Sequence, residues 1–424
     1  MFNSFYTIAL IAALTIFAGP ALAQVCQGPF ETITQLERPI EASYAVWNAQ
    51  YGEKTIQEKF DAGATSAAGN AVLAGFAKDE KGKPSLLLVE VNQRGRAIWE
   101  KKSAIGGIEK ITKMFVRKGA YVLLADQKDG VWIGWFNSKG GLIRQSRIAE
   151  QGTSLSGRDL IASNDGKGYV LAATSKPKNG PLHAVLYRLN EQGEAQGSRS
   201  YMPGLENSLQ AVVASGNGYI AAGALRGENG MNAGWLMRLT DDLALDWQRQ
   251  YPQRGPVSIG RVSVYNDTHI VTAGQAGTAL WLMGLDSSGS PQWQRFYMGK
   301  DRMLLRDMLP YGDGRVSVLA ESYAMPEVPD YAMMLTVSPY GGLLQTEMFN
   351  QMESVSVSDI FEGAQGQRGV AGFAHQTVKL RDPEKPEAEP VTVRDLNGWV
   401  LSAVPSKSAA GDCDAFKAEA AQKP

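Results

Sequence analysis

Short apolar runs alternate with polar turns along nearly the whole chain, and one arrangement of them recurs. In Gly216–Tyr251 an apolar run ends at Ala-Gly and a polar loop follows. A second apolar run then carries Trp235, and a tight turn leads to a segment with Trp247. Asp267–Tyr297 and Gly69–Lys101 have the same arrangement. Apolar runs of this length, bounded by Gly, Asn and Asp, predict β-strands joined by hairpin turns.

Seven units of this kind follow one another. Their second strands are expected at Ala71–Gly75, Tyr121–Ala125, Tyr169–Ala173, Tyr219–Gly223, His269–Gly274, Val316–Ala320 and Gly369–Gly372. Their third strands are expected at Ser85–Val91, Val131–Phe136, Ala184–Leu189, Gly234–Leu239, Leu280–Leu285, Ala332–Val337 and Gly398–Ala403. The fourth-strand positions are Trp47, Trp99, Gln145, Gly197, Trp247, Trp293 and Gln345, in steps of about 46 to 52 residues. Four strands per unit at this period are typical of β-propeller blades.

The two ends of the chain complement each other. Tyr44–Tyr51 matches a fourth strand, but no first three strands precede it, whereas Val355–Ala403 contains three strands and no fourth. Pairing the two would leave no sheet edge open at the seam. The sequence therefore predicts an all-β fold: a seven-bladed β-propeller with four-stranded blades, in which an N-terminal strand closes the ring.

The chain begins with a segment typical of export. Ile8–Phe17 is apolar, Gly19 and Pro20 interrupt it, and Ala21–Ala23 forms an A-x-A cleavage site. A membrane anchor is the alternative, although the run is short for a span of about 20 residues. We interpret residues 1–23 as a signal peptide, 24–43 as a lead-in, 44–404 as the propeller and 405–424 as a tail. The expected location is the periplasm or the exterior.

Two cysteines, Cys26 and Cys413, lie near the two ends of the exported chain. In an oxidising compartment an even pair favours a disulfide, which here would fasten the closure of the ring. Two unrelated thiols are the alternative.

Charge and composition exclude some partners. The formal net charge is −1, so there is no basic surplus for nucleic acid or an anionic membrane. The three histidines, His183, His269 and His375, occupy different places in their units, and no phosphate-binding loop or nucleophile motif stands in a meaningful context. We expect no cofactor, no membrane span after signal cleavage and a monomeric scaffold. The nine Trp are expected to pack between blades, with an aromatic ligand cage as the alternative.

The pattern G-Y-I-x-A-G … W-L-M-x-L-D-x-x-G-x-x-x-W-x-x-x-Y resembles the repeats of secreted bacterial β-propellers in the quinoprotein-like and outer-membrane-assembly-like group. The resemblance is strongest at Gly69–Lys101, Gly216–Tyr251 and Asp267–Tyr297. It implies a propeller fold and export, not an activity. The quinone-dependent dehydrogenases of that group usually have eight blades and a vicinal Cys pair, which this sequence lacks.

One polar position recurs in the first strands, which line the channel of a propeller. Its occupants are Asp61, Lys113, Asp159, Gln210, Arg261, Asp307 and Asp359. One hypothesis is a charged ring that binds a ligand or ion, with Asp307 and Asp359 close enough to hold a cation or to raise a pKa. The alternative is a solvated wall of mixed sign in which neighbouring charges satisfy one another.

Function is expected where the units differ. The loops between second and third strands emerge on one face, and the longest of them is Gln376–Asn397. This segment either binds a partner or is a solvated excursion. We expect a non-enzymatic binding or scaffold protein of the cell envelope that holds a protein or saccharide on this face. The alternative is a propeller enzyme, a lyase or hydrolase, that uses the carboxylates at the channel mouth on an extracellular substrate.

Overall fold

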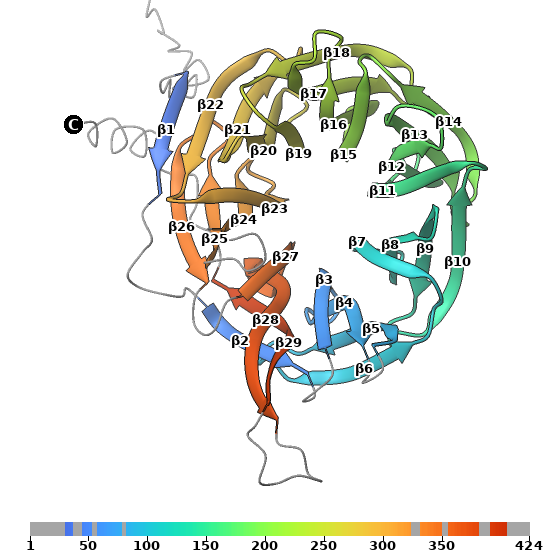
Figure 1. The fold of residues 1–424 in the computed structure, drawn as a ribbon, viewed down its shortest axis with the longest axis vertical. Helices are drawn as coiled ribbons and strands as arrows, with labels where there is room; N and C mark the ends of the chain where they lie inside the picture. Colours follow the sequence, from blue (N-terminus) through green and yellow to red (C-terminus); the bar gives the residue numbers. More distant parts are fainter. Residues whose placement is uncertain are drawn as a thin grey trace, which may run out of the picture.

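The computed structural model describes residues 30–36, 45–52, 57–78, 82–323, 331–349, 355–380 and 391–404. Within these ranges, the strands form seven sheets that surround a central axis in sequence order (Figure 1). The predicted seven-bladed propeller is therefore confirmed. No helix in the described ranges is long and apolar enough to cross a membrane. Residues 1–23, Cys26 and Cys413 lie outside these ranges, so the signal peptide and the disulfide stay predictions.

Blades are numbered from the sheet that begins with β3. Blade 1 consists of β3 (Gln57–Thr65), β4 (Ala71–Lys78), β5 (Pro84–Val91) and β6 (Ala97–Ser103). Blade 2 consists of β7 (Ile108–Arg117), β8 (Ala120–Gln127), β9 (Gly130–Phe136) and β10 (Leu142–Ala149). Blade 3 consists of β11 (Thr153–Ala162), β12 (Gly168–Pro177), β13 (His183–Asn190) and β14 (Ala195–Tyr201). Blade 4 consists of β15 (Glu206–Ser215), β16 (Gly218–Arg226), β17 (Asn232–Thr240) and β18 (Leu245–Pro252).

The remaining blades use both ends of the chain. Blade 5 consists of β19 (Val257–Tyr265), β20 (His269–Ala276), β21 (Ala279–Asp286) and β22 (Pro291–Met298), joined by β1 (Glu31–Gln35). Blade 6 consists of β23 (Arg302–Pro310), β24 (Val316–Tyr323), β25 (Tyr331–Val337) and β26 (Leu343–Phe349). Blade 7 consists of β27 (Val355–Glu362), β28 (Arg368–Leu380), β29 (Val391–Ala403) and β2 (Ala45–Tyr51), with a 3₁₀ turn at Ala364–Gly366.

The ring closes in blade 7 as the sequence predicts. β2 pairs antiparallel with β29, with Trp47 opposite Ser402 and Tyr51 opposite Gly398. The Tyr51 hydroxyl donates a hydrogen bond to the Gly95 carbonyl of blade 1, at 2.6 Å. An N-terminal strand thus supplies both the fourth strand of the last blade and a contact to the first.

β1 was not predicted, since its residues fall in the segment expected to be a polar lead-in. It pairs parallel with β22 as a fifth strand on the outside of blade 5 (Figure 1). The Leu36 amide then donates to the Met298 carbonyl at 2.7 Å. Leu36 is buried between blades 5 and 6. The outer edge of β22 accepts a strand because its backbone groups face no other strand.

The long segment Gln376–Asn397 is largely strand. β28 and β29 pair without interruption from Arg368 opposite Ala403 to Leu380 opposite Val391. The hairpin projects beyond the other blades (Figure 1). Only residues 381–390 of the expected loop lie outside the described ranges.

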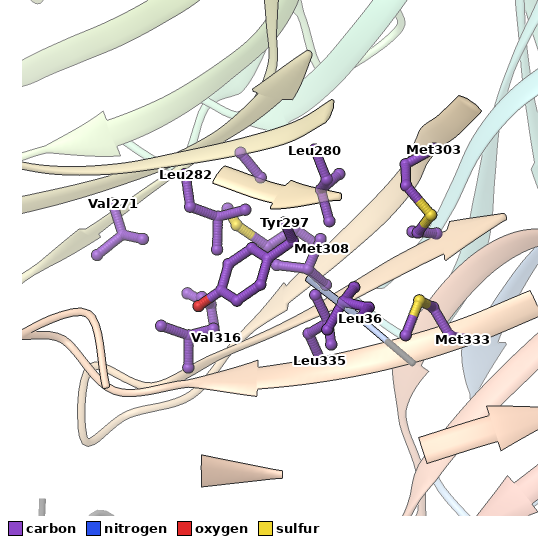
Figure 2. Packing of buried hydrophobic residues seen from close by; sticks show 14 of the residues in the cluster. Leu36, Val271, Leu280, Leu282, Tyr297, Met303, Met308, Val316, Met333 and Leu335 are labelled. Atoms are coloured by element: carbon purple, nitrogen blue, oxygen red, sulfur yellow. The ribbon is translucent and has the colours of Figure 1, made fainter. Parts of the chain in front are cut away.

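Side chains from neighbouring blades meet in one hydrophobic cluster at every blade interface. The seven clusters join blades 1–2, 2–3, 3–4, 4–5, 5–6, 6–7 and 7–1. Figure 2 shows the cluster of blades 5 and 6, where Leu282 and Tyr297 face Val316 and Leu335. Second and third strands pack on both faces, which explains why they read as continuous apolar runs and not as alternating ones.

The tryptophans pack between blades, as expected. Trp132, Trp135, Trp235, Trp281, Trp293 and Trp399 are buried. Trp47, Trp99 and Trp247 are partly buried against the clusters. The partner of several of them is the turn between third and fourth strands in the next blade. A Cβ built on Gly95 would lie 2.9 Å from the Trp47 ring, and one on Gly289 would lie 2.8 Å from the Trp247 ring. These turn glycines also have positive φ, so both backbone conformation and packing require glycine.

Blades 6 and 7 are also joined by a fully buried ion pair. Arg368 contacts Glu347 with two nitrogens, one of them at 2.9 Å, and its Nε donates to the Val404 carbonyl at 2.9 Å. Both side chains have no exposed surface. Each charge therefore depends on the other for compensation.

We predict that Arg368→Met lowers the free energy of unfolding by about 3–5 kcal/mol, because the buried carboxylate of Glu347 loses its ion pair with Arg368. The matched control is Arg199→Met, which breaks the exposed Arg199–Asp242 pair and should cost less than about 1 kcal/mol. Urea unfolding followed by tryptophan fluorescence measures both. The double variant Arg368→Met/Glu347→Met should lose less stability than Arg368→Met alone, and an equal or larger loss would contradict this account.

Candidate functional site

Each innermost strand has a β-bulge at the same place. The register between first and second strands skips one residue at this place in every blade, and the skipped residues are Asp61, Thr112, Arg158, Gln210, Gly260, Arg306 and Ser358. Blade 2 has a further skip at Glu109. A bulge re-aims the side chain of its extra residue. All seven line one cavity of about 660 Å³. The bulges therefore place one residue from every blade around the central channel.

The cavity opens toward one end of the ring. Besides the bulge residues, its wall includes residues near the starts of first strands, such as Lys110 and Ser258. It also includes Gln275 and Tyr323 at the ends of second strands, and His375 in the long strand β28 at the base of its extension. Both sets lie at the end of the ring that carries the loops between second and third strands. The cavity and the β28–β29 hairpin thus share the face on which the sequence places partner binding.

The polar ring expected from spacing is divided between two positions. Asp61 and Gln210 are bulge residues. The other five members, Lys113, Asp159, Arg261, Asp307 and Asp359, each follow the bulge residue by one. Among these five, Arg261 lines the cavity, where its predecessor is a glycine. The binding role of the six charged residues stays a prediction.

Three of the carboxylates reach the next blade instead of the cavity. Asp159 accepts a hydrogen bond from the Val212 amide at 2.9 Å, Asp307 from the Ile360 amide at 3.1 Å, and Asp359 from the Gly63 amide at 2.6 Å. In each case the donor is the amide two residues after the bulge residue in the first strand of the next blade. These carboxylates join adjacent blades, including blade 7 to blade 1 at the seam.

Two more acids act the same way from the ends of second strands. Asp126 accepts from the Gly157 amide and the Ser156 hydroxyl, both at 2.7 Å. Glu321 accepts from the Val357 amide at 2.6 Å. Carboxylates therefore form hydrogen bonds between blades from two places: the first strands and the ends of the second strands.

Asp307, Asp359 and Arg261 form one electrostatic unit. Burial raises the pKa of Asp359 well above its usual range, and the charge of Asp307 raises it further. Burial would also raise the pKa of Asp307, but Arg261 and its hydrogen bonds hold that pKa below the usual value. Arg261 forms an ion pair with Asp307. The surroundings therefore favour the ionised form of Asp307 beside the Arg261 guanidinium, and the protonated form of Asp359.

This unit leaves no clear place for a cation. Arg261 supplies the positive charge that the hypothesis assigned to a metal. Within the described residues there is no group of three or more His, Cys, Asp or Glu side chains that could hold a metal ion.

The cavity wall carries more positive than negative charge. Its charged residues are Lys110, Arg158, Arg261, Arg306 and Asp61. Asp61 pairs with Lys59 at 2.9 Å, and burial raises its pKa. Arg306 pairs with Glu321 and donates to the Tyr323 hydroxyl at 2.6 Å.

Spacing alone missed Lys110, Arg158 and Arg306. The dipeptide Arg-Asp occurs at positions 158–159 and again at 306–307, in the first strands of blades 3 and 6. That repeat was the available signal. Because of the bulge, the Arg of such a pair faces the cavity while its Asp contacts the next blade. The regular alternation of a strand does not predict this arrangement.

Comparison with known proteins shows the fold. No family model and no curated protein matches the chain. Among solved structures, puromycin hydrolase is similar at 12% identity and a TM-score of 0.50, over 80% of this chain and 51% of the hydrolase chain. A mutant of that hydrolase complexed with PGG matches at 12% identity and a TM-score of 0.50, over 76% of this chain and 51% of its own. A subtype N10 neuraminidase-like protein from a little yellow-shouldered bat isolate matches at 9% identity and a TM-score of 0.42, over 84% of this chain and 98% of its own.

At these identities the likeness is limited to the β-propeller architecture. This chain spans about half the length of the puromycin hydrolase chain. Activity therefore has to be argued from the residues of the site itself.

We predict that two substitutions at this site differ in how much they lower the free energy of unfolding. Asp307→Asn leaves Arg261 without its carboxylate and should cost about 2 kcal/mol or more, whereas Asp359→Asn resembles the protonated carboxyl and should change stability by less than about 1 kcal/mol. Urea unfolding at neutral pH measures both.

The stability of the protein is also expected to depend on pH through Asp359. A folded-state pKa raised above that of the unfolded chain means that the folded state holds a proton the unfolded chain releases above about pH 4. Stability due to Asp359 therefore falls as pH rises from there through its folded-state pKa. Asp359→Asn removes this fall, so the variant should gain stability relative to the parent as the pH rises above about 4. Parallel stability profiles for the two proteins would show that Asp359 is already ionised in the fold.

Proposed function

We propose that this protein is a non-enzymatic binding or scaffold protein of the cell envelope, which holds a protein or saccharide on the face where the channel cavity opens. The observation that carries the proposal is the division of charge in the channel. Asp159, Asp307 and Asp359 are engaged between blades, while the cavity wall presents mostly cationic and neutral polar groups together with Asp61. Such a wall suits recognition of a ligand, and the two carboxylates to which the alternative assigns catalysis, Asp307 and Asp359, do not line it.

The location rests on the sequence. The segment 1–23 has the features of a signal peptide, and the repeat pattern resembles that of secreted bacterial propellers. The periplasm or the exterior is the location we propose, and an envelope protein or saccharide is the corresponding partner.

The β28–β29 hairpin supports the choice of face. It extends from the same end of the ring as His375, which lines the cavity, and it projects outward (Figure 1). A hairpin that projects from the rim on the face where the cavity opens gives a partner both a concave site and a raised edge to contact.

A hydrolase is the second candidate, on one observation. The Ser356 hydroxyl and His375 Nε2 are 3.0 Å apart, and both residues line the cavity. In this alternative, Ser356 Oγ attacks a substrate carbonyl carbon while His375 Nε2 takes the hydroxyl proton. The carboxylates expected to perform catalysis, Asp307 and Asp359, are not among the lining residues.

We predict that shortening the hairpin removes the partner. Replacing residues 378–393 with a two-residue turn keeps the pair Thr377–Arg394 and removes the projection. Capture from an envelope extract, compared by mass spectrometry and by saccharide composition, should lose a partner that the parent protein retains. The control is Lys139→Ala with Lys167→Ala, on turns at the opposite end of the ring, and it should retain the partner.

Two results would contradict the proposal. One is the same set of partners in the parent and the shortened protein. The other is covalent labelling by a fluorophosphonate probe that disappears in Ser356→Ala, which would favour the hydrolase.

A further inference from the structure

Two cations of the cavity wall, Arg158 and Lys110, form no ion pair with any described residue, and the charge of Arg158 acts on Lys110. Within the described ranges, neither Arg158 nor Lys110 forms an ion pair or hydrogen bond through its side chain. The Nε of Arg158 is enclosed by protein and has no acceptor there, so the protein offers this atom no compensation. Because polar groups withdrawn from water usually have partners, and because Arg158 lines the cavity, we look for the partner of its guanidinium in a ligand.

The nearby acids are engaged elsewhere. Asp159 follows Arg158 in the chain, but it pairs with Lys113 and accepts from Val212 in blade 4. Asp126 accepts from Gly157 and Ser156. Asp61 is paired with Lys59. Among the described residues, none of these carboxylates forms an ion pair or hydrogen bond with Arg158 or Lys110; Asp61, whose Oδ2 has no hydrogen-bond partner, and Asp126 act on Lys110 only through their charge.

The two cations disfavour each other when the cavity holds only water. Withdrawal from solvent lowers the pKa of Lys110, and the charge of Arg158 lowers it further. Arg261 acts in the same direction from blade 5, whereas Asp126 and Asp61 act in the opposite one. Lys110 of blade 2, Arg158 of blade 3 and Arg261 of blade 5 therefore place positive charge in the same part of the channel.

These side chains match the chemistry of an oxyanion. The planar guanidinium of Arg158 can donate two parallel hydrogen bonds to two oxygens of one group, and the Lys110 ammonium adds a compact charge. Thr112 and Gln210, the bulge residues of the blades on either side of Arg158, add neutral hydrogen-bonding groups to the same wall.

We propose that Arg158 and Lys110 form the centre of an anion-binding site in the channel, which takes a carboxylate or phosphate group of the ligand. Arg261 completes the positive field from the opposite wall. This inference rests on the proposed binding function and names the chemistry that the ligand must carry.

The test is calorimetric titration of the full exported chain with two probes, inorganic phosphate and glucuronate, at fixed ionic strength. The parent protein should bind at least one probe, and the stronger one identifies the group as phosphate or carboxylate. Arg158→Gln and Lys110→Gln should each weaken binding about tenfold or more, since a charge-assisted hydrogen bond is lost. Arg158→Lys should weaken it less than Arg158→Gln.

The matched control is Lys139→Gln, which removes the same charge from an exposed turn at the other end of the ring and should leave the dissociation constant unchanged. A second readout separates the site from general charge. A bound anion raises the pKa of Lys110, so binding at alkaline pH should take up protons. Titrations in two buffers of different ionisation enthalpy measure that uptake, and Lys110→Gln should abolish it.

The inference is overturned if the parent protein binds neither probe, or if Arg158→Gln and Lys139→Gln weaken binding equally. Either result leaves the proposed function standing when partner capture still depends on the β28–β29 hairpin. Loss of hairpin dependence with retained anion binding would instead contradict the proposed function alone.

Discussion

The structure depends on one contact repeated around the channel: a carboxylate of one blade accepts a hydrogen bond from the first-strand backbone of the next. Asp159, Asp307 and Asp359 make this contact just beyond a β-bulge. A ring of blades must match each sheet to two neighbours, and hydrophobic packing is non-directional. A directional bond to a backbone amide fixes the position of one blade against the next between blades 3 and 4, between blades 6 and 7, and at the seam between blades 7 and 1.

This contact also decides what remains for a ligand. Aspartates that face the next blade cannot act on a molecule in the channel. Because the bulge turns the preceding residue toward the cavity, Arg158 and Arg306 line the wall while their neighbours Asp159 and Asp307 do not. Arg306 is neutralised by Glu321, but Arg158 is not. The same backbone irregularity therefore holds the ring together and sets the charge of its cavity.

Much of the fold follows from the sequence alone, because a propeller is periodic. Seven recurrences of apolar runs and turns place nearly every strand, and the missing fourth strand of the last unit identifies β2 as the closing strand. β1 escaped prediction because its five residues form too short an alternation, and because a sheet edge that attracts it is visible only in three dimensions. The extension of β28 and β29 escaped because the charged, Pro-rich stretch 381–390 between them led the whole of Gln376–Asn397 to be read as a loop.

The site was less predictable than the fold. Constant spacing identified polar positions in the first strands, but it could not show which of two adjacent residues faces the cavity. A bulge shifts the alternation by one residue, and nothing in a regular strand pattern marks where this occurs. In blade 5 the residue after the bulge, Arg261, lines the cavity, whereas in blade 3 the bulge residue itself, Arg158, lines it and Asp159 does not. The sequence aligns both pairs at one position of the repeat.

Crystals soaked in selenate, an oxyanion that the selenium absorption edge can locate, would test the central claim most directly. The account predicts an anomalous peak inside the channel, within hydrogen-bonding distance of the Arg158 guanidinium and close to the Lys110 ammonium. Peaks confined to the outer surface, with Arg158 turned toward a carboxylate of the protein, would contradict it.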